Sequence, residues 1–180
     1  MHRAPLLQLV ESYKINYPAE TETVSEYKDF VIANENCFER SLLEGHITCG
    51  AWILDGSGTK TLLTHHRKLN RWLQLGGHAD GDHDVHRVAA KEAQEESGIS
   101  TLELVSKDIF DIDIHKIPTR GDVPAHLHYD ARFLFRTTEN EKYEVSNESI
   151  DLAWVKIDEI EKYSLEESIL RMVEKTKEFI

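Results

Sequence analysis

Three glutamates fall within one turn of a predicted helix: Glu92, Glu95 and Glu96. At 3.6 residues per turn they lie on the same side as Val85 and Val88, the side that should face the core. Carboxylates three or four residues apart repel each other by about 0.2–0.5 kcal/mol per pair, and more when they are partly buried. A bound Mg²⁺ or Mn²⁺ would remove this repulsion, because both ions prefer oxygen ligands. The shared face therefore favours a metal site over the alternative, an ordinary acidic helix in an acidic chain.

The segments on either side of the glutamates should hold them in place. The helix should begin near Asp84, which can cap its first turn, and run to Ser97, with Gly98 suited to end it. Before the helix, Gly76 and Gly77 end a short strand and lead into the loop HADGD. Such glycines allow the backbone to approach a ligand closely, although a plain turn is the simpler explanation of the glycines alone.

The segment 77–99 resembles the Nudix box, the signature of the Nudix hydrolases. That signature reads G, five residues, E, seven residues, R-E-U-x-E-E-x-G-U, where U is a bulky aliphatic residue. The matching positions at the required spacing are Gly77, Glu92, Glu95, Glu96, Gly98 and Ile99. The positions that differ are His83 for the family's Glu, Lys91 for its Arg, and Ala93 for a larger aliphatic residue. The wider stretch GGHADGD looks like a bacterial Nudix subgroup.

The resemblance implies a divalent-metal site on this helix, with Mg²⁺ or Mn²⁺ as the cofactor. Glu95 and Glu96 would be metal ligands. Glu92 would be a further ligand or would orient the attacking water, and Gly77 would offer its backbone carbonyl.

The positions that differ from the signature concern the support of the site. In the family, the residues at the positions of His83 and Lys91 form a salt bridge that braces the loop against the helix. A His–Lys pair can do this only with an acidic residue between the two, and Asp82 or Asp84 could serve. The changes at positions 83 and 91 therefore affect the rigidity of the loop more than the metal chemistry, because the three helix carboxylates are present.

Charged residues outside the motif could complete the site. Nudix enzymes often supply a further catalytic or metal-binding glutamate from a later loop, a role that Glu148 would fill, with Glu144 as a rival. The segment HHRKLNRW places Arg67, Lys68 and Arg71 just before the glycines, where they could bind the phosphates of a substrate. Solvated basic residues in a hairpin loop are an equally good explanation of that segment.

A second group of polar residues alternates along the predicted strand HLHYDARFLFRT. One face of this strand carries His126, His128, Asp130 and Arg132. The other face carries Leu127, Tyr129, Ala131 and Phe133, which suit a core. The polar face should look toward a cleft or toward water. His126 and His128 are candidates for substrate binding, and together with His78 they could form a second metal or phosphate site. A hydrogen-bond network on a solvent-facing strand is a slightly better explanation.

The order of predicted elements indicates an α+β protein. Helical spacing appears at 4–16, 22–34 and 165–179. Strand-like segments include HITCGAWILD, TKTLLTHH and WLQLGG, with DGSG as a hairpin turn. We expect a helical extension at 1–44 and a Nudix domain at 45–180, with a mixed sheet sandwiched between helices as in the Nudix fold.

Composition limits the possible functions. The net charge of −12 argues against binding a nucleic acid polymer, whose affinity depends on neutralising phosphates, but leaves room for a small anionic substrate. No apolar run is long enough for a membrane span, and two cysteines are too few for a disulfide framework. We expect a cytoplasmic protein, with a homodimer as a possibility.

The function expected from these residues is the metal-dependent hydrolysis of a phosphoanhydride bond. The expected substrate is a nucleoside diphosphate linked to another moiety. The alternatives are a nucleoside triphosphate pyrophosphohydrolase and a Nudix module that senses a nucleotide without cleaving it. The presence of all three helix glutamates favours an enzyme.

Overall fold

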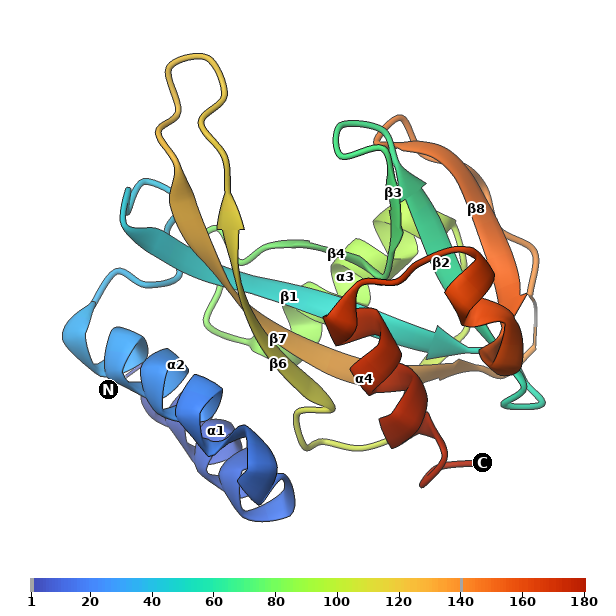
Figure 1. Cartoon of the computed structure of the whole chain (residues 1–180), viewed down its shortest axis with the longest axis horizontal. Coiled ribbons are helices and arrows are strands. Elements are labelled where there is room, and N and C mark those ends of the chain that lie inside the picture. Colours follow the sequence, from blue (N-terminus) through green and yellow to red (C-terminus); the bar gives the residue numbers. More distant parts are fainter. Residues whose placement is uncertain (1, 140) are drawn as a thin grey trace.

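A mixed eight-stranded sheet forms the centre of the computed structural model, which describes residues 2–139 and 141–180 (Figure 1). Its central strand β1 (Gly45–Leu54) pairs in parallel with β7 (His126–Thr137) along its whole length. The other strands are β2 (Lys60–His66), β3 (Arg71–Leu73), β4 (Leu75–His78), β5 (Leu102–Leu104), β6 (Asp111–Ile117) and β8 (Ser149–Lys156). Strand β4 pairs antiparallel with β1, and β6 pairs antiparallel with β7.

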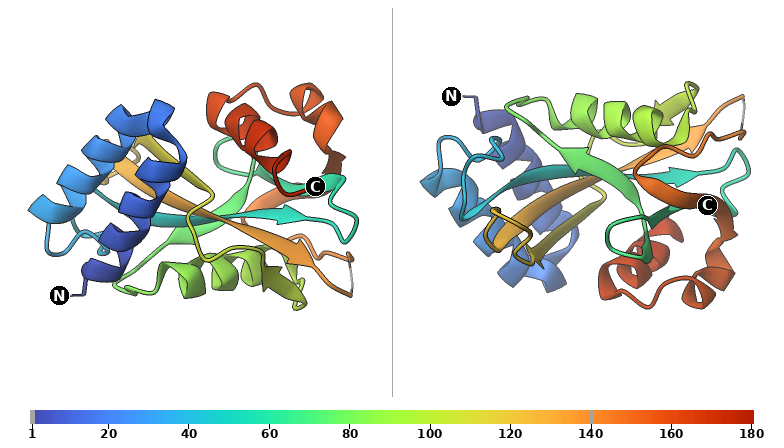
Figure 2. Two further views of the ribbon diagram at one scale, coloured as in Figure 1. Left: turned by 90° about the horizontal axis from the view of Figure 1, so that it is seen from below. Right: turned by 90° about the horizontal axis from the view of Figure 1, so that it is seen from above.

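Helices cover both faces of the sheet. Helix α3 (Val85–Ser97) and helix α4 (Glu167–Thr176) lie on opposite faces, as Figure 2 shows. Helices α1 (Ala4–Asn16) and α2 (Thr21–Ala33) pack side by side at one end of the sheet. Short 3₁₀ helices, η1 (Pro18–Glu20) and η2 (Ile157–Lys162), precede α2 and α4. Within the described residues, no helix combines the length and the apolar character needed to cross a bilayer.

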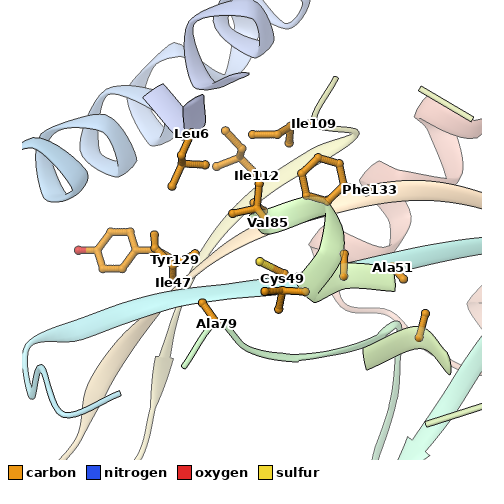
Figure 3. Close-up of a cluster of buried hydrophobic side chains, with 14 of the residues drawn as sticks. Leu6, Ile47, Cys49, Ala51, Ala79, Val85, Ile109, Ile112, Tyr129 and Phe133 are labelled. Carbon is orange, nitrogen blue, oxygen red and sulfur yellow. The ribbon is translucent and has the colours of Figure 1, made fainter. Parts of the chain in front are cut away.

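Alternation along β1 and β7 divides the interior into two cores, because successive side chains of a strand point to opposite faces. Ile47, Cys49, Tyr129 and Phe133 pack with the N-terminal helices and α3 in the first core (Figure 3). On the other face, Trp52 packs with α4 in the second core and donates its indole N–H to Thr176 at 2.9 Å.

The N-terminal helices belong to the first core. Leu6 and Val10 of α1 and Val24 of α2 are buried in the same cluster as the sheet and α3. The ring of Phe30 stacks on Tyr129 of β7, with ring centroids 3.7 Å apart. Removal of these helices would therefore expose one end of the sheet.

The predicted helices and strands are confirmed with small changes at their ends. The two N-terminal helices end within one residue of the expected positions, and β7 has the expected bounds. The segment WLQLGG divides at Gln74, because β3 pairs with β2 whereas β4 crosses to pair with β1. The closing helix is shorter than expected at both ends. It starts only at Glu167 because Glu166 has an extended backbone.

A buried ion network ties β6, β7 and α4 together. Arg132 is only 2% exposed, and its guanidinium binds Asp111 and Asp113 of β6, both at 3.1 Å, and Asp130 of its own strand at 2.8 Å. Arg171 of α4 also reaches Asp111, at 2.7 Å. We expected the polar face of β7 to look toward a cleft or water, but these groups enclose Asp130 and Arg132 instead. The counter-charges come from β6 and α4, which the sequence of β7 alone does not reveal.

We predict that Arg132→Met lowers the free energy of unfolding by about 3–5 kcal/mol at pH 7, because it leaves the buried carboxylate of Asp130 without its cation. Urea unfolding followed by circular dichroism measures the change. The control is Arg87→Met, which breaks an exposed pair with Asp82 and should cost at most about 1 kcal/mol. Equal losses in the two variants would contradict the importance of the network.

Candidate functional site

Helix α3 begins and ends as its sequence predicts. The Asp84 carboxylate accepts a hydrogen bond from the Arg87 N–H at 3.2 Å, and Gly98 ends the helix in the left-handed conformation, with φ of +70°. Burial of Val88 and Ala93 then fixes the rotation of the helix about its axis. The glutamates lie in its second half, where the negative end of the helix dipole disfavours further negative charge. Both the helix and its charges therefore favour a bound cation there.

Glu96 is the most buried of the three glutamates. Its side chain accepts a hydrogen bond from the backbone N–H of Gly76 at 2.9 Å, and only 5% of the residue is exposed. Burial raises the pKa of Glu96 to about 7, and the charges of Glu148 and Glu92 act in the same direction. The residue is therefore held in place while its charge is poorly compensated.

Glu92 lies against the strand end at Gly77. A Cβ atom at position 77 would overlap the Glu92 carboxylate, so any side chain there would displace this carboxylate from its position. Burial raises the pKa of Glu92, and neighbouring carboxylates add to this, although Lys91 lies 3.7 Å away and opposes the shift. Glycine at 77 thus allows the helix carboxylate and the strand backbone to meet.

Glu95 occupies the rim of the site. Its side chain is 59% exposed and lies 3.5 Å from the Lys91 ammonium. The structure thus brings Glu92 and Glu96 together against β4 and leaves Glu95 nearer to solvent.

Glu148 lies on the turn directly before β8. Its charge contributes to the raised pKa of both Glu92 and Glu96, so it faces the same site. Its rival Glu144 packs against Gly98 at the end of α3, where its N–H binds the Ser97 carbonyl at 2.7 Å. The geometry favours Glu148 as the fourth carboxylate, and its role remains a prediction.

Two of the three candidate phosphate-binding cations have protein partners. Arg67 donates to the backbone carbonyls of Asn147 and Ser149 at 3.0 and 2.7 Å, and so holds the turn that carries Glu148. Arg71 pairs with Glu166 at 2.7 Å. Lys68 is exposed, and its carbonyl accepts a hydrogen bond from Arg120. These three residues remain predictions as phosphate ligands.

Arg40 was not identified from the sequence, yet it fixes the loop that follows Gly77. Its guanidinium binds both carboxylate oxygens of Asp80, and the Gly81 N–H donates to the Phe38 carbonyl at 2.9 Å. The segment before β1 therefore clamps the HADGD loop. No local pattern marks Arg40, because its partner lies 40 positions away in the sequence.

The brace between loop and helix differs from the arrangement that we expected. Arg87 binds Asp82 at 2.9 Å and also contacts Asp84, while Lys91 turns to Glu92 and Glu95. His83 packs against the rings of Phe38 and His2, with centroids 5.0 and 4.3 Å away. The brace thus shifts to Arg87, and an aromatic contact holds the loop at His83.

The candidate histidines of β7 lie in a separate cluster on the other face of the sheet. The ring centroids of His126 and His128 are 4.9 Å from that of His46, and His78 is 5.0 Å from His128. His46 was not identified from the sequence. It joins the group because the parallel register sets it opposite His128.

The donors on α3 fit a hard divalent cation. They are carboxylate oxygens, two of them with a raised pKa, beside a glycine that leaves the backbone open. Glu92, Glu96 and the Gly77 carbonyl would hold the ion, with Glu95 and Glu148 at its edge.

The sequence matches the NUDIX domain family over residues 45–176, and the chain therefore belongs to this family. Its members are hydrolases that act on acid anhydrides, in general on nucleoside diphosphate derivatives, and they generally use divalent metal ions. No match was found among curated proteins.

Solved structures share the fold. An Ap4A hydrolase from C. elegans has a TM-score of 0.60 and 18% identity, over 74% of this chain and 96% of the other. A Nudix-family hydrolase from Clostridium perfringens has a TM-score of 0.57 and 24% identity, over 75% and 98%. The dihydroneopterin triphosphate pyrophosphohydrolase of E. coli has a TM-score of 0.56 and 13% identity, over 72% and 92%.

We predict that Gly77→Ala weakens Mn²⁺ binding at least about tenfold, because the new methyl group displaces the Glu92 carboxylate. Isothermal titration calorimetry measures the affinity. Gly56→Ala is the matched control, since a Cβ there meets only ordinary contacts beyond 3.7 Å, and it should leave the affinity unchanged. Unchanged Mn²⁺ binding in Gly77→Ala would remove Glu92 from the site.

We also predict that Mn²⁺ affinity depends on pH near neutrality. Glu96 has a pKa of about 7 without metal, so below pH 7 a proton competes with the ion. The apparent affinity should fall by about tenfold per pH unit below pH 7 and level off above it, as one competing proton requires. In Glu96→Gln this dependence should disappear from that range. A dependence of equal slope in the variant would assign the proton to another group.

Proposed function

We propose that this chain hydrolyses a phosphoanhydride bond in a nucleoside diphosphate linked to another moiety, with Mg²⁺ or Mn²⁺ as cofactor. The observation that supports this most directly is the position of Glu92 and Glu96 against Gly77 and Gly76, where burial raises the pKa of both and the charge of Glu148 adds to the shift. When bound, the cation would neutralise the diphosphate and lower the pKa of a water molecule.

The carboxylates divide the remaining work. Glu96 is fixed by the Gly76 N–H and serves as an oriented ligand. Glu148 stands on a turn that Arg67 holds by its backbone, which suits a group that must accept a proton from the attacking water at a defined place. Lys68, Arg71 and the free edge of Arg67 are the proposed donors to phosphate oxygens. His126 and His128, which we expected to bind the substrate, are not part of this proposal, because they lie in the cluster on the other face of the sheet.

A triphosphate substrate is the second candidate, because one structural neighbour is a triphosphate pyrophosphohydrolase. The third is a module that binds a nucleotide without cleaving it.

We also propose that residues 1–44 form an extension to a Nudix domain at 45–180. We further propose that the chain forms a homodimer and that it is located in the cytoplasm. The location is supported by two buried free cysteines.

We expect metal-dependent cleavage of one compound class well above the others in a substrate panel. The panel offers nucleoside triphosphates, ADP-ribose, NADH, nucleotide sugars, dinucleoside polyphosphates and CoA with Mg²⁺ and then Mn²⁺, and follows the release of phosphate and nucleoside monophosphate. Preferred release of pyrophosphate from triphosphates would support the second candidate. Tight binding of one compound without cleavage would support the third.

We predict that Glu96→Gln lowers kcat/KM at least about 100-fold on the best compound of the panel. Glutamine can still accept the Gly76 hydrogen bond, so the thermal unfolding temperature should stay close to that of the unchanged chain. The control is Glu103→Gln, the same change at an exposed position on β5. Full activity of Glu96→Gln with unchanged metal dependence would overturn the site assignment.

A further inference from the structure

Five histidines gather on the face of the sheet that α3 does not cover. His46, His128 and His115 are cross-strand neighbours on β1, β7 and β6, and His78 sits opposite Thr48 of β1. His126, two residues before His128, completes the group at the rim. The ring centroids of neighbouring members lie between 4.9 and 5.3 Å apart. The sheet register alone therefore brings together residues from four strands.

Within this group, His46, His78 and His128 each offer one ring nitrogen as a possible metal ligand. The three nitrogens lie within 4.8 Å of one another. His46 is buried, at 3% exposed, and the other two are partly buried. Ligands about 2.0–2.1 Å from a tetrahedral ion lie about 3.3–3.4 Å apart, so the rings would move closer together when an ion binds.

Two buried ring nitrogens of these three histidines have no hydrogen-bond partner among the described residues. The Nδ1 atom of His46 lies 3.5 Å from the Leu42 carbonyl, to which it can donate a long hydrogen bond. That leaves Nε2 as the atom with a free lone pair, and it has no hydrogen-bond partner among the described residues. The buried Nε2 of His128 is likewise unpartnered in the described part of the chain. A buried polar atom without a partner is costly, and a metal ion would satisfy both atoms at once. A carbonyl acceptor behind His46 is the usual outer partner of a metal-ligating histidine.

We propose that His46, His78 and His128 form a binding site for a divalent transition-metal ion that prefers nitrogen ligands, such as Zn²⁺. Imidazole suits Zn²⁺ and its neighbours in the first transition row, whereas Mg²⁺ prefers oxygen. Three protein ligands leave the fourth position of a tetrahedral ion open to water or an anionic oxygen.

This site is independent of the carboxylates on α3. Gly77 and His78 are adjacent on β4, and successive residues of a strand face opposite sides. Gly77 faces Glu92, so His78 points to the other face of the sheet. A result that contradicts the proposed function of the carboxylate site therefore leaves the proposed histidine site untouched. A result that contradicts the histidine site likewise leaves the proposed function untouched.

A neighbouring set of possible ligands, Asp113, His115 and Asp130, is a weaker candidate. Its potential ligand atoms also lie within 4.8 Å of one another. However, Arg132 already donates to both carboxylates, at 3.1 and 2.8 Å. A cation there would have to compete with a buried guanidinium, whereas no cation contacts the three histidine nitrogens directly in the described residues. Asp113, His115 and Asp130 therefore border the three proposed histidine ligands, with the His115 ring beside that of His128.

The test loads Zn²⁺ into the chelator-treated Glu92→Gln, Glu96→Gln variant of this 180-residue chain, in which the carboxylate site is disabled. We expect one bound Zn²⁺ per chain by elemental analysis after dialysis. X-ray absorption at the zinc edge should show nitrogen at about 2.0–2.1 Å with the scattering pattern of imidazole. Adding His46→Gln and His128→Gln should weaken Zn²⁺ binding at least about 100-fold. Adding His86→Gln instead, at a histidine bound to the Lys107 carbonyl, should change nothing.

Any of three results would overturn the proposal. One is an absence of retained Zn²⁺ in the chain with intact histidines. Another is a bound ion whose absorption spectrum shows only oxygen ligands. Because the spectrum is recorded on a chain with all its histidines, the test does not depend on whether the His46→Gln, His128→Gln variant folds. Zn²⁺ retained by that variant with the same affinity and spectrum would also exclude these ligands.

Discussion

The parallel pairing of β1 with β7 is the constraint on which the rest of the structure depends. It buries both strands and sets their alternation in phase, so that Ile47 and Tyr129 face the N-terminal helices while His46 and His128 face the other side. A shift of one residue would exchange the two faces. The first core fixes α3, and α3 carries the glutamates. The opposite face carries the histidine cluster and the ion network around Arg132.

The two faces treat buried charge in different ways. Around Arg132, the carboxylates of β6 and β7 have their cations built into the fold. Around Glu96, a single backbone N–H is the only partner that the described residues show by hydrogen bonding, and the pKa rises accordingly. A closed network of the first kind holds structure together, whereas an open cluster of the second kind is suited to take a cation from solution.

Much of this arrangement could be predicted from the sequence. The period of the acidic helix, its caps and the spacing from Gly77 to Ile99 indicated the position and the family of the carboxylate site. The partners of β7 could not be predicted, because Asp111, Asp113 and His46 belong to strands whose register depends on the whole sheet. The same limit applies to Arg67 and Arg71, whose types suggested phosphate binding although they have backbone and carboxylate partners in the fold.

The clamp on the HADGD loop lies outside the segment that the family shares. Arg40 and Phe38 precede residue 45, where the family match begins, yet they hold Asp80 and Gly81 beside the site. A relative without such a preceding segment must fix its loop by other means. The shape of this loop, and any selectivity that it imposes, therefore depends on the N-terminal segment as well as on the motif. Exchange of the motif between relatives would carry over the helix carboxylates and the Arg87–Asp82 pair without the clamp from Arg40.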